Sequence, residues 1–163
     1  MRDDIGGFRK EGFSLVELVI VIVIIGIIAA IAVPRISSGA SGAGEKAMIA
    51  NLSLLRKAID LFAAEHEGRL PTTIKFVEEL TQYTDVARNR SLTRNATFKY
   101  GPYLGAVPSL SVGSLKGNAK VTTGASPGAN SGGGWWYKET TGEIRANLKD
   151  TEVDAQGVPY NKY

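Results

Sequence analysis

The chain has 163 residues, a formal net charge of +3, no cysteine and a single histidine, His66. The lack of cysteine excludes a disulfide framework and thiolate metal ligands, and one histidine excludes any site that needs two. Because the positive charge is small and spread along the chain, we expect no nucleic-acid binding by the chain itself. The length allows one domain of ordinary size with a modest core.

An apolar segment follows the first twelve residues. Between Phe13 and Val33 the only charged residue is Glu17, and Leu18 to Val33 carries no charge at all. At about 1.5 Å per residue, a helix of this length would span one bilayer core of about 30 Å. Many of its residues are β-branched, but in lipid only a helix satisfies its own backbone hydrogen bonds. The segment therefore predicts a transmembrane helix.

The residues of this helix are compatible with three fates of the segment in the cell: cleavage as a signal peptide, retention as an anchor, or the third fate described last. An ordinary signal peptide would have a shorter apolar stretch and a small-residue cleavage site, for which Ala30-Ile31-Ala32 would serve. The chain would then be a soluble exported binding protein or enzyme. The helix could also be an uncleaved anchor for an unrelated domain. The third fate depends on the preceding MRDDIGGFRKEG, a short polar stretch with three basic residues.

The stretch KEGFSLVELVIVIVIIGIIAAIAVPR, starting at Lys10, resembles the signal and first helix of type IV pilins and type II secretion pseudopilins. The resemblance implies that a prepilin peptidase cuts between Gly12 and Phe13, on the cytoplasmic side, and methylates the new N-terminal Phe13. It also implies that Glu17 is the family's fifth mature residue and that Pro34 is its helix-kinking proline. These four features stand in register, so residues 1–12 are expected to be a leader peptide.

Glu17 raises a physical question, because a carboxylate inside an apolar helix is costly unless a cation lies beside it. Cleavage after Gly12 would create such a cation, the free amine of Phe13, one helical turn away in the same chain. Between chains, Glu17 of an incoming subunit can pair with Phe13 of its neighbour and set the axial register of a filament. The alternative is that Glu17 is merely solvated at headgroup depth.

The helix is expected to continue beyond the apolar part. Pro34 lacks an N–H and clashes with the preceding turn, so a kink or loosening is expected there. Residues 37–44, SSGASGAG, are poor helix formers. Apolar residues then recur four, three, four and three apart on one face: Met48, Leu52, Leu55, Ile59 and Phe62. We predict an assembly half over residues 13–36 and an amphipathic half over residues 37–68, ending near Gly68.

Residues 69–163 are expected to form a periplasmic or extracellular headpiece. A loop and a short helix are predicted first, with Phe76, Val77 and Leu80 facing inward and Thr73 as a possible cap. Residues 88–97 are polar and predict a loop. The fold class expected is α+β, with the long helix packed on a small C-terminal antiparallel sheet.

The strand signals are strongest near the C-terminus. Residues 119–123 are one candidate, and GGGWWYKETTGEIRANL at residues 132–148 predicts a hairpin that turns through Thr141-Gly142. Because side chains alternate along a strand, we expect one of Trp135 and Trp136 in the core and the other exposed as an anchor for a partner.

Catalytic and metal sites are not expected. One histidine with scattered serines is a poor basis for hydrolysis, and His66 is interpreted as a helix-end group favoured by the helix dipole. Asp150, Glu152 and Asp154 alternate in a way that could hold calcium, and the resemblance implies a calcium site in the C-terminal region of the major pseudopilin. This chain lacks a loop that aligns with that site, so a solvated acidic turn and no cofactor are predicted.

The resemblance favours the major pseudopilin of type II secretion, a structural subunit and not an enzyme. The PTT segment after the long helix and the GWWY…TGEI hairpin support it, and the lack of a C-terminal cysteine pair departs from the common pilin pattern. A type IV pilin of a surface fibre, serving adhesion, motility or DNA uptake, is the alternative. Expected partners are identical subunits, prepilin peptidase, the inner-membrane assembly platform and minor pseudopilins. The expected location is the bacterial inner membrane, with a periplasmic headpiece that moves into a filament.

Overall fold

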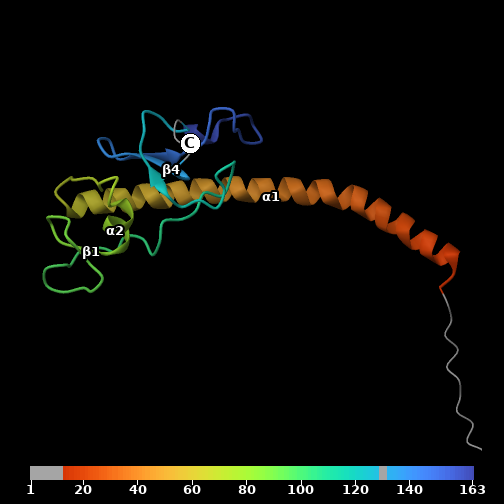
Figure 1. The fold of residues 1–163 in the computed structure, drawn as a ribbon, viewed down its shortest axis with the longest axis horizontal. Helices are drawn as coiled ribbons and strands as arrows, with labels where there is room; N and C mark the ends of the chain where they lie inside the picture. The colour runs from red at the N-terminus through yellow and green to blue at the C-terminus, as the bar shows by residue number, and fades with distance from the viewer. Residues whose placement is uncertain (1–12, 129–131) are drawn as a thin grey trace, which may run out of the picture. The chain divides into compact units, whose positions relative to one another are not determined.

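The computed structural model of the protein describes residues 13–128 and 132–163, except for the side chains of residues 31–41. The chain divides into two units, Met1–Ala40 and Ser41–Tyr163. The elements in chain order are α1 (Leu15–Glu65), α2 (Phe76–Thr81), β1 (Tyr83–Thr84), β2 (Arg90–Ser91), β3 (Val121–Thr122), β4 (Trp135–Lys138), β5 (Glu143–Ala146) and a 3-10 turn, η1 (Tyr160–Lys162) (Figure 1).

The predicted long helix is confirmed as α1. Its backbone bounds include Pro34 and the glycine-rich residues 37–44, so poor local propensity does not interrupt the helix. The side chain of Pro34 lies outside the described residues, and the kink there stays a prediction. The helix ends as expected: Gly68 has a φ of +80° and its N–H donates to the carbonyl of Ala63 at 2.8 Å.

The core of the second unit lies along one face of α1. The predicted stripe is confirmed, since each of its five residues is at most 1 % exposed. In Figure 1 the strand β4 lies above the C-terminal part of α1, and α2 and β1 lie below it. The stripe packs with residues from α2, both strands of the hairpin and the intervening loops: Phe76, Leu80, Leu104, Leu110, Val112, Trp135, Tyr137, Ile144, Ala146 and Leu148.

The larger sheet has the order β3-β4-β5, and the prediction that it is antiparallel is wrong for one pair of strands. β4 and β5 form the expected antiparallel hairpin, with Trp135 opposite Ala146. β3, however, runs parallel to β4, with Val121 opposite Trp135. A tight turn cannot join parallel strands, and the twelve residues between Thr122 and Trp135 are long enough for the connection that a parallel pair requires. The sheet is therefore mixed, and the α+β class is confirmed.

A second sheet pairs β1 with β2, so the prediction of an unstructured loop at residues 88–97 is wrong for Arg90 and Ser91. The pairing is explained by side-chain hydrogen bonds. The Asp85 carboxylate accepts hydrogen bonds from the backbone N–H and the Nδ2 of Asn89, both at 2.8 Å. This Asx turn aligns the two short strands although neither has a strong strand propensity.

The short helix α2 differs in two respects from its prediction. Phe76 and Leu80 face inward as expected, but Val77 is 45 % exposed and the buried third residue is Glu79. Thr73 does not cap the helix, because α2 starts later, after Lys75. Instead, the Glu79 carboxylate reaches back and accepts bonds from the N–H of Thr72 at 2.7 Å and from its hydroxyl at 3.3 Å.

Candidate functional site

The N-terminal part of α1 is the candidate assembly segment, taken here as Phe13 to Ala30, whose side chains are described. The helix begins with a hydrogen bond from the N–H of Leu18 to the carbonyl of Ser14, at 3.1 Å. Every large apolar side chain from Phe13 to Ile28 is between 44 and 79 % exposed, on all sides of the helix. A helix that is apolar all round needs an apolar environment, and within the single chain these side chains have none.

Glu17 is the acidic residue in the first turn of α1, where the positive end of the helix dipole favours a carboxylate. It is exposed, and no ion pair found in the described part of the chain involves it. The other predicted processing residue, Gly12, lies outside the described residues. The structure thus places Phe13 and Glu17 at the start of the same exposed helix, and their charge pairing stays a prediction.

Within residues 13–128 and 132–163, no helix combines the length and the uniform apolarity that a membrane crossing requires.

A comparison with protein families finds the prokaryotic N-terminal methylation motif at residues 7–33. The similarity lies in the N-terminal segment of the chain. The motif covers the predicted cleavage junction and the whole described assembly segment, and it confirms the resemblance to type IV pilins and pseudopilins. It does not distinguish a secretion pseudopilin from a pilin. Comparisons with curated proteins and with solved structures give no match.

The described part of the chain has a second exposed surface, which the sequence alone did not indicate. On α1, opposite the buried stripe, residues three and four apart are exposed and mostly apolar: Ala47, Ala50, Leu54, Lys57, Leu61 and Ala64. We call this set the back face of α1. Leu54 is 47 % and Leu61 57 % exposed. The same 3.6-residue periodicity that identified the stripe also identifies the back face, once the helix is known to be covered on one side only.

The headpiece holds α1 from Gly44 onwards. The Ser111 hydroxyl donates to the carbonyl of Gly44 at 2.7 Å, and a side chain on Gly44 would meet the carbonyl oxygen of Ser111 at 3.0 Å. At the next residue, the Glu45 carboxylate accepts bonds from the N–H of Ala155 and the hydroxyl of Tyr160, both at 3.2 Å. Because Gly44 has no side chain, the loop that contains Ser111 can approach α1 closely.

His66 lies at the end of α1, as expected, but its surroundings differ from those of a simple helix-end group. Its ring is fully buried, stacks on Phe62 at 3.9 Å between centroids, and lies against Tyr100 and Tyr103. Nδ1 donates to the carbonyl of Phe62 at 2.8 Å, while Nε2 has no partner among the described residues. These three aromatic rings surround His66, which is therefore a buried residue and not an exposed helix-end group.

The expectation that one tryptophan of β4 is exposed is wrong. Trp135 is completely buried and Trp136 is only 4 % exposed. The indole N–H of Trp135 donates to the carbonyl of Pro108 at 2.7 Å, and that of Trp136 donates to Gly124 at 3.1 Å. Because both rings are buried and both indole N–H groups have partners, neither ring is free to anchor a partner.

The three acids near the C-terminus are separate hydrogen-bond acceptors. Asp150 accepts from the side chain of Asn161 at 2.6 Å, and Glu152 accepts from the N–H of Ser114 at 2.7 Å. Asp154 accepts from two backbone N–H groups and from the Tyr163 hydroxyl. In the described ranges no three acidic or histidine side chains come together in a way that could hold a metal ion. Asp154 is only 7 % exposed, so the prediction of a solvated turn is wrong for that residue.

These hydrogen bonds lower the pKa values of Asp150 and Asp154. The Tyr163 hydroxyl, aided by the backbone N–H donors, holds the pKa of Asp154 below its usual value of 3.8. The same bond raises the pKa of Tyr163 to about 12. The side-chain amide of Asn161 and the Lys162 ammonium likewise lower the pKa of Asp150. The ionised carboxylates therefore accept the hydrogen bonds that hold the C-terminal segment in place.

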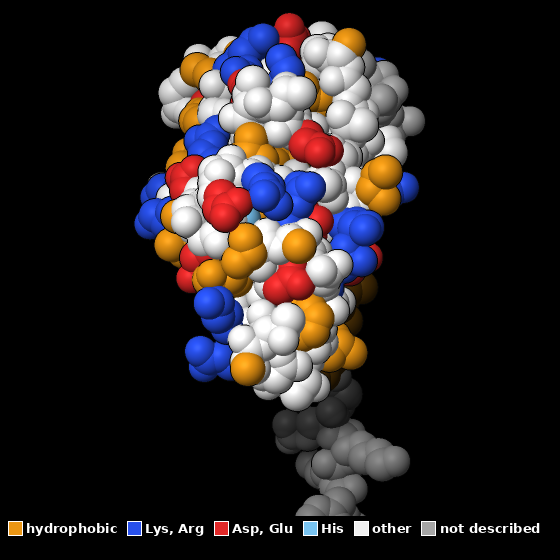
Figure 2. Space-filling view, turned by 90° about the vertical axis from the view of Figure 1, so that its left-hand side faces the viewer, with side chains coloured by type: hydrophobic (Ala, Val, Ile, Leu, Met, Phe, Trp, Pro, Cys, Tyr) orange, Lys and Arg blue, Asp and Glu red, His pale blue; other side chains and the backbone are white. Residues whose placement is uncertain are grey.

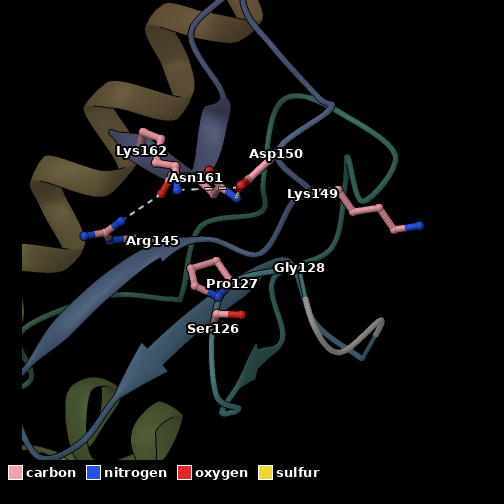
Figure 3. Close-up of a pocket in the computed structure, with 8 residues that line it drawn as sticks. All are labelled: Ser126, Pro127, Gly128, Arg145, Lys149, Asp150, Asn161 and Lys162. Carbon is pink, nitrogen blue, oxygen red and sulfur yellow. Dashed lines mark hydrogen bonds and ion pairs between the residues drawn. The ribbon is translucent and has the colours of Figure 1, made fainter.

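A hollow of about 330 Å³ lies beside Asp150 (Figure 3). Its lining is mostly polar: Ser126, Pro127, Gly128, Arg145, Lys149, Asp150, Asn161 and Lys162. Three of its charged groups already have partners, since Arg145 bonds to the carbonyl of Asn161 at 3.3 Å and Lys162 lies 3.7 Å from Asp150. The Lys149 side chain points away from the hollow. The groups do not converge on one point, so we assign no ligand to this hollow.

Proposed function

We propose that the protein is a structural subunit of a type II secretion pseudopilus. Prepilin peptidase cuts it between Gly12 and Phe13 and methylates Phe13, and the subunit polymerises through α1 to drive protein export. It waits in the bacterial inner membrane, with residues 13–36 inserted and the headpiece in the periplasm, and its role is not catalytic. The observation that carries this proposal is the methylation motif at residues 7–33, on a helix whose apolar side chains are exposed on every side.

The proposed assembly step uses the single acid of the assembly segment. An incoming subunit places Glu17 beside the Phe13 amine of a subunit already in the filament, and the charge pair fixes the axial register. Glu17 is exposed at the start of α1, so a neighbouring chain has access to its carboxylate. The register matters because apolar contacts alone fit almost equally well at several axial shifts.

The back face of α1 extends the proposed contact into the headpiece. Its small and apolar side chains let another helix approach closely, and Lys57 in its middle can reach past the contact to solvent. Filament packing would cover Leu54 and Leu61, which the headpiece leaves half exposed. A loosened turn near Pro34 would allow the two parts of α1 to adopt the angle that packing requires.

The choice of secretion over a surface fibre rests on the sequence. The PTT segment and the GWWY…TGEI hairpin resemble pseudopilins, and the chain has no cysteine for the C-terminal pair common in pilins. The partners proposed are the same as those expected from the resemblance: identical subunits, minor pseudopilins, prepilin peptidase and the inner-membrane assembly platform.

The experiment that tests the function is deletion of the gene in its own host, followed by two assays. Loss of exported proteins from the culture supernatant, with surface fibres and twitching intact, is the expected result. Loss of surface fibres with normal export would assign the protein to a type IV pilus instead. Complementation with the wild-type gene is the control, and complementation with Glu17→Val tests whether the function requires assembly.

A further inference from the structure

The segment of residues 86–99, which includes β2 and which we call the basic loop, is rich in positive charge, with Arg94 and Lys99 exposed and Arg88 and Arg90 half-buried. It contains four cations and no acid: Arg88, Arg90, Arg94 and Lys99. None of the ion pairs found in the described ranges involves any of these four side chains. The nearby carboxylates of Asp85 and Glu79 bond to Asn89 and Thr72, and neither forms an ion pair with these cations among the described residues.

Hydrogen bonds within the loop fix its conformation. The Asn95 side chain accepts bonds from the N–H groups of Thr97 and Phe98, both at 2.9 Å. At its beginning, the Arg88 guanidinium donates to the carbonyl of Leu70 at 3.1 Å and ties the loop to the segment before α2. A partner that binds a loop of fixed shape loses less conformational entropy than one that must order it.

The basic loop also presents an aliphatic side chain. Leu92 is 83 % exposed and lies between Arg90 and Arg94 in the sequence. Figure 2 looks onto the end of the headpiece where β1 lies in Figure 1, and at its lower edge blue and orange side chains gather below the red ones. An aliphatic residue flanked by arginines is the composition of an interface anchor with a charged rim.

We propose that the basic loop is a docking surface for an acidic segment of a partner protein. Arg90 and Arg94 bind its carboxylates, and Leu92 enters an apolar gap between them. Arginine suits this role because its planar fork of N–H donors matches a carboxylate bidentately. The proposal goes beyond the proposed assembly function and does not depend on it, since the loop is not part of the assembly segment or the back face.

Two other anionic partners fit the loop less well. Single-stranded nucleic acid is bound on exposed aromatic rings, but Phe98 and Tyr100 are half buried, and the ammonium of Lys99 lies 5.1 Å from the Tyr100 ring centroid. A lipid surface is usually entered by several apolar or aromatic side chains, whereas Leu92 is the only large apolar residue well exposed between residues 88 and 99 of the described loop.

The test uses the full-length protein in a neutral detergent at low salt. The probe is a fluorescent peptide of glutamates with leucine at every fourth position, and its Kd is measured by anisotropy. We expect Arg90→Glu with Arg94→Glu to weaken binding at least tenfold. The matched control, Lys116→Glu with Lys120→Glu, makes the same change in net charge at exposed sites elsewhere and should alter Kd less than twofold. Equal thermal midpoints of all variants show that folding is unaffected.

Leu92→Ser should weaken binding of the leucine-containing peptide several-fold and leave binding of an all-glutamate peptide unchanged. Unaltered peptide binding by the double arginine variant would overturn the proposal, as would an equal loss in the lysine control. A single-stranded DNA or phosphatidylglycerol vesicles bound at least tenfold more tightly through the same arginines would also overturn it, in favour of a different class of partner.

Discussion

Glu17 is the only charged residue between Phe13 and Val33, and the structure leaves it exposed in the first turn of α1. A lone carboxylate among so many apolar side chains lowers the favourable free energy of burying the segment. Its presence is explained if the assembled state supplies a cation at the same depth. The proposed cation is the amine of Phe13, which exists only after cleavage, so processing and assembly are linked through a single residue.

Glu17→Val is predicted to leave cleavage intact and to abolish filaments. The variant removes a charge from the apolar segment, so insertion should be as good or better, but the neighbour's amine stays unpaired at a cost of about 3–5 kcal/mol. Glu17→Gln should be intermediate, because an amide accepts a hydrogen bond from the amine without bringing an opposite charge. Cleavage is followed by mass and filament yield by shearing, in the same cells. Wild-type filament yield from processed Glu17→Val subunits would exclude the charge pair.

Asp154 is predicted to make the stability of the headpiece depend on pH. Its pKa in the folded state is below its usual value of 3.8, so its contribution is present above that pH and is lost as the pH falls through the folded-state pKa. Asp154→Asn should therefore lower the urea midpoint at pH 7. Between pH 5 and pH 3 the urea midpoint of this variant should decrease less with falling pH than that of the wild type. Asp60→Asn, an exposed change on α1, is the control. Equal pH profiles of Asp154→Asn and wild type would contradict this.

The burial of a residue could be predicted from the sequence where the local pattern determines it. It could not be predicted where contacts with distant segments determine it. The spacing of Met48 and Phe62 fixes their common face on a helix, and both are buried. Trp136, by contrast, is buried and bonds to Gly124, which is distant from it in the sequence. The alternation of side chains along a strand cannot predict such a contact. The role of Glu79 was missed for the same reason, because its partner Thr72 lies outside the helix.

At the scale of elements, the long helix and the β4–β5 hairpin follow from the sequence, and the direction of β3 does not. Helical periodicity and turn chemistry are local, whereas the parallel pairing of β3 with β4 depends on the path of the connection between them. Gly134, just before β4, shows how tight that path is. A Cβ at this position would overlap the carbonyl oxygen of Asn118, so the strand can enter the sheet only without a side chain there.

Gly134→Ala is predicted to destabilise the headpiece by about 1–3 kcal/mol, because the backbone around Asn118 must shift to accept the methyl group. Gly105→Ala is the matched control, since a Cβ there has no atom within 4 Å, and it should change stability by less than about 0.5 kcal/mol. Urea unfolding of the two variants gives the comparison. Similar midpoints for both would show that the crossover tolerates a side chain and that the parallel pairing is less constrained.

At the scale of the whole molecule, the described residues include two exposed surfaces proposed for filament assembly and one proposed for docking a partner. The assembly segment and the back face of α1 are apolar and belong to one helix, and the basic loop is charged and belongs to the headpiece. The motif at the N-terminus could be recognised from the sequence, because the prediction and the family comparison overlap over residues 10–33. The back face and the basic loop needed the fold, which shows what the headpiece covers and what it leaves free.

Leu54→Glu is predicted to reduce filament yield strongly without unfolding the headpiece. The side chain is half exposed in the single chain, so the change should cost less than about 0.5 kcal/mol in the free energy of unfolding. In a filament the same carboxylate would be buried against a neighbouring helix without a partner. Ile74→Glu, at an exposed site outside α1, should leave the yield unchanged. A normal yield from Leu54→Glu would remove the back face from the proposed contact.

The central claim is that this is a processed filament subunit, and the mass of its mature form tests that claim most directly. The protein should be isolated from the membrane fraction of a cell that contains prepilin peptidase, and its N-terminus determined by mass spectrometry. We predict a chain that begins at Phe13 and carries one added methyl group, while Gly12→Leu should stay at full length. A wild-type chain that begins at Val33 or later, or a Gly12→Leu chain cut normally, would contradict the account.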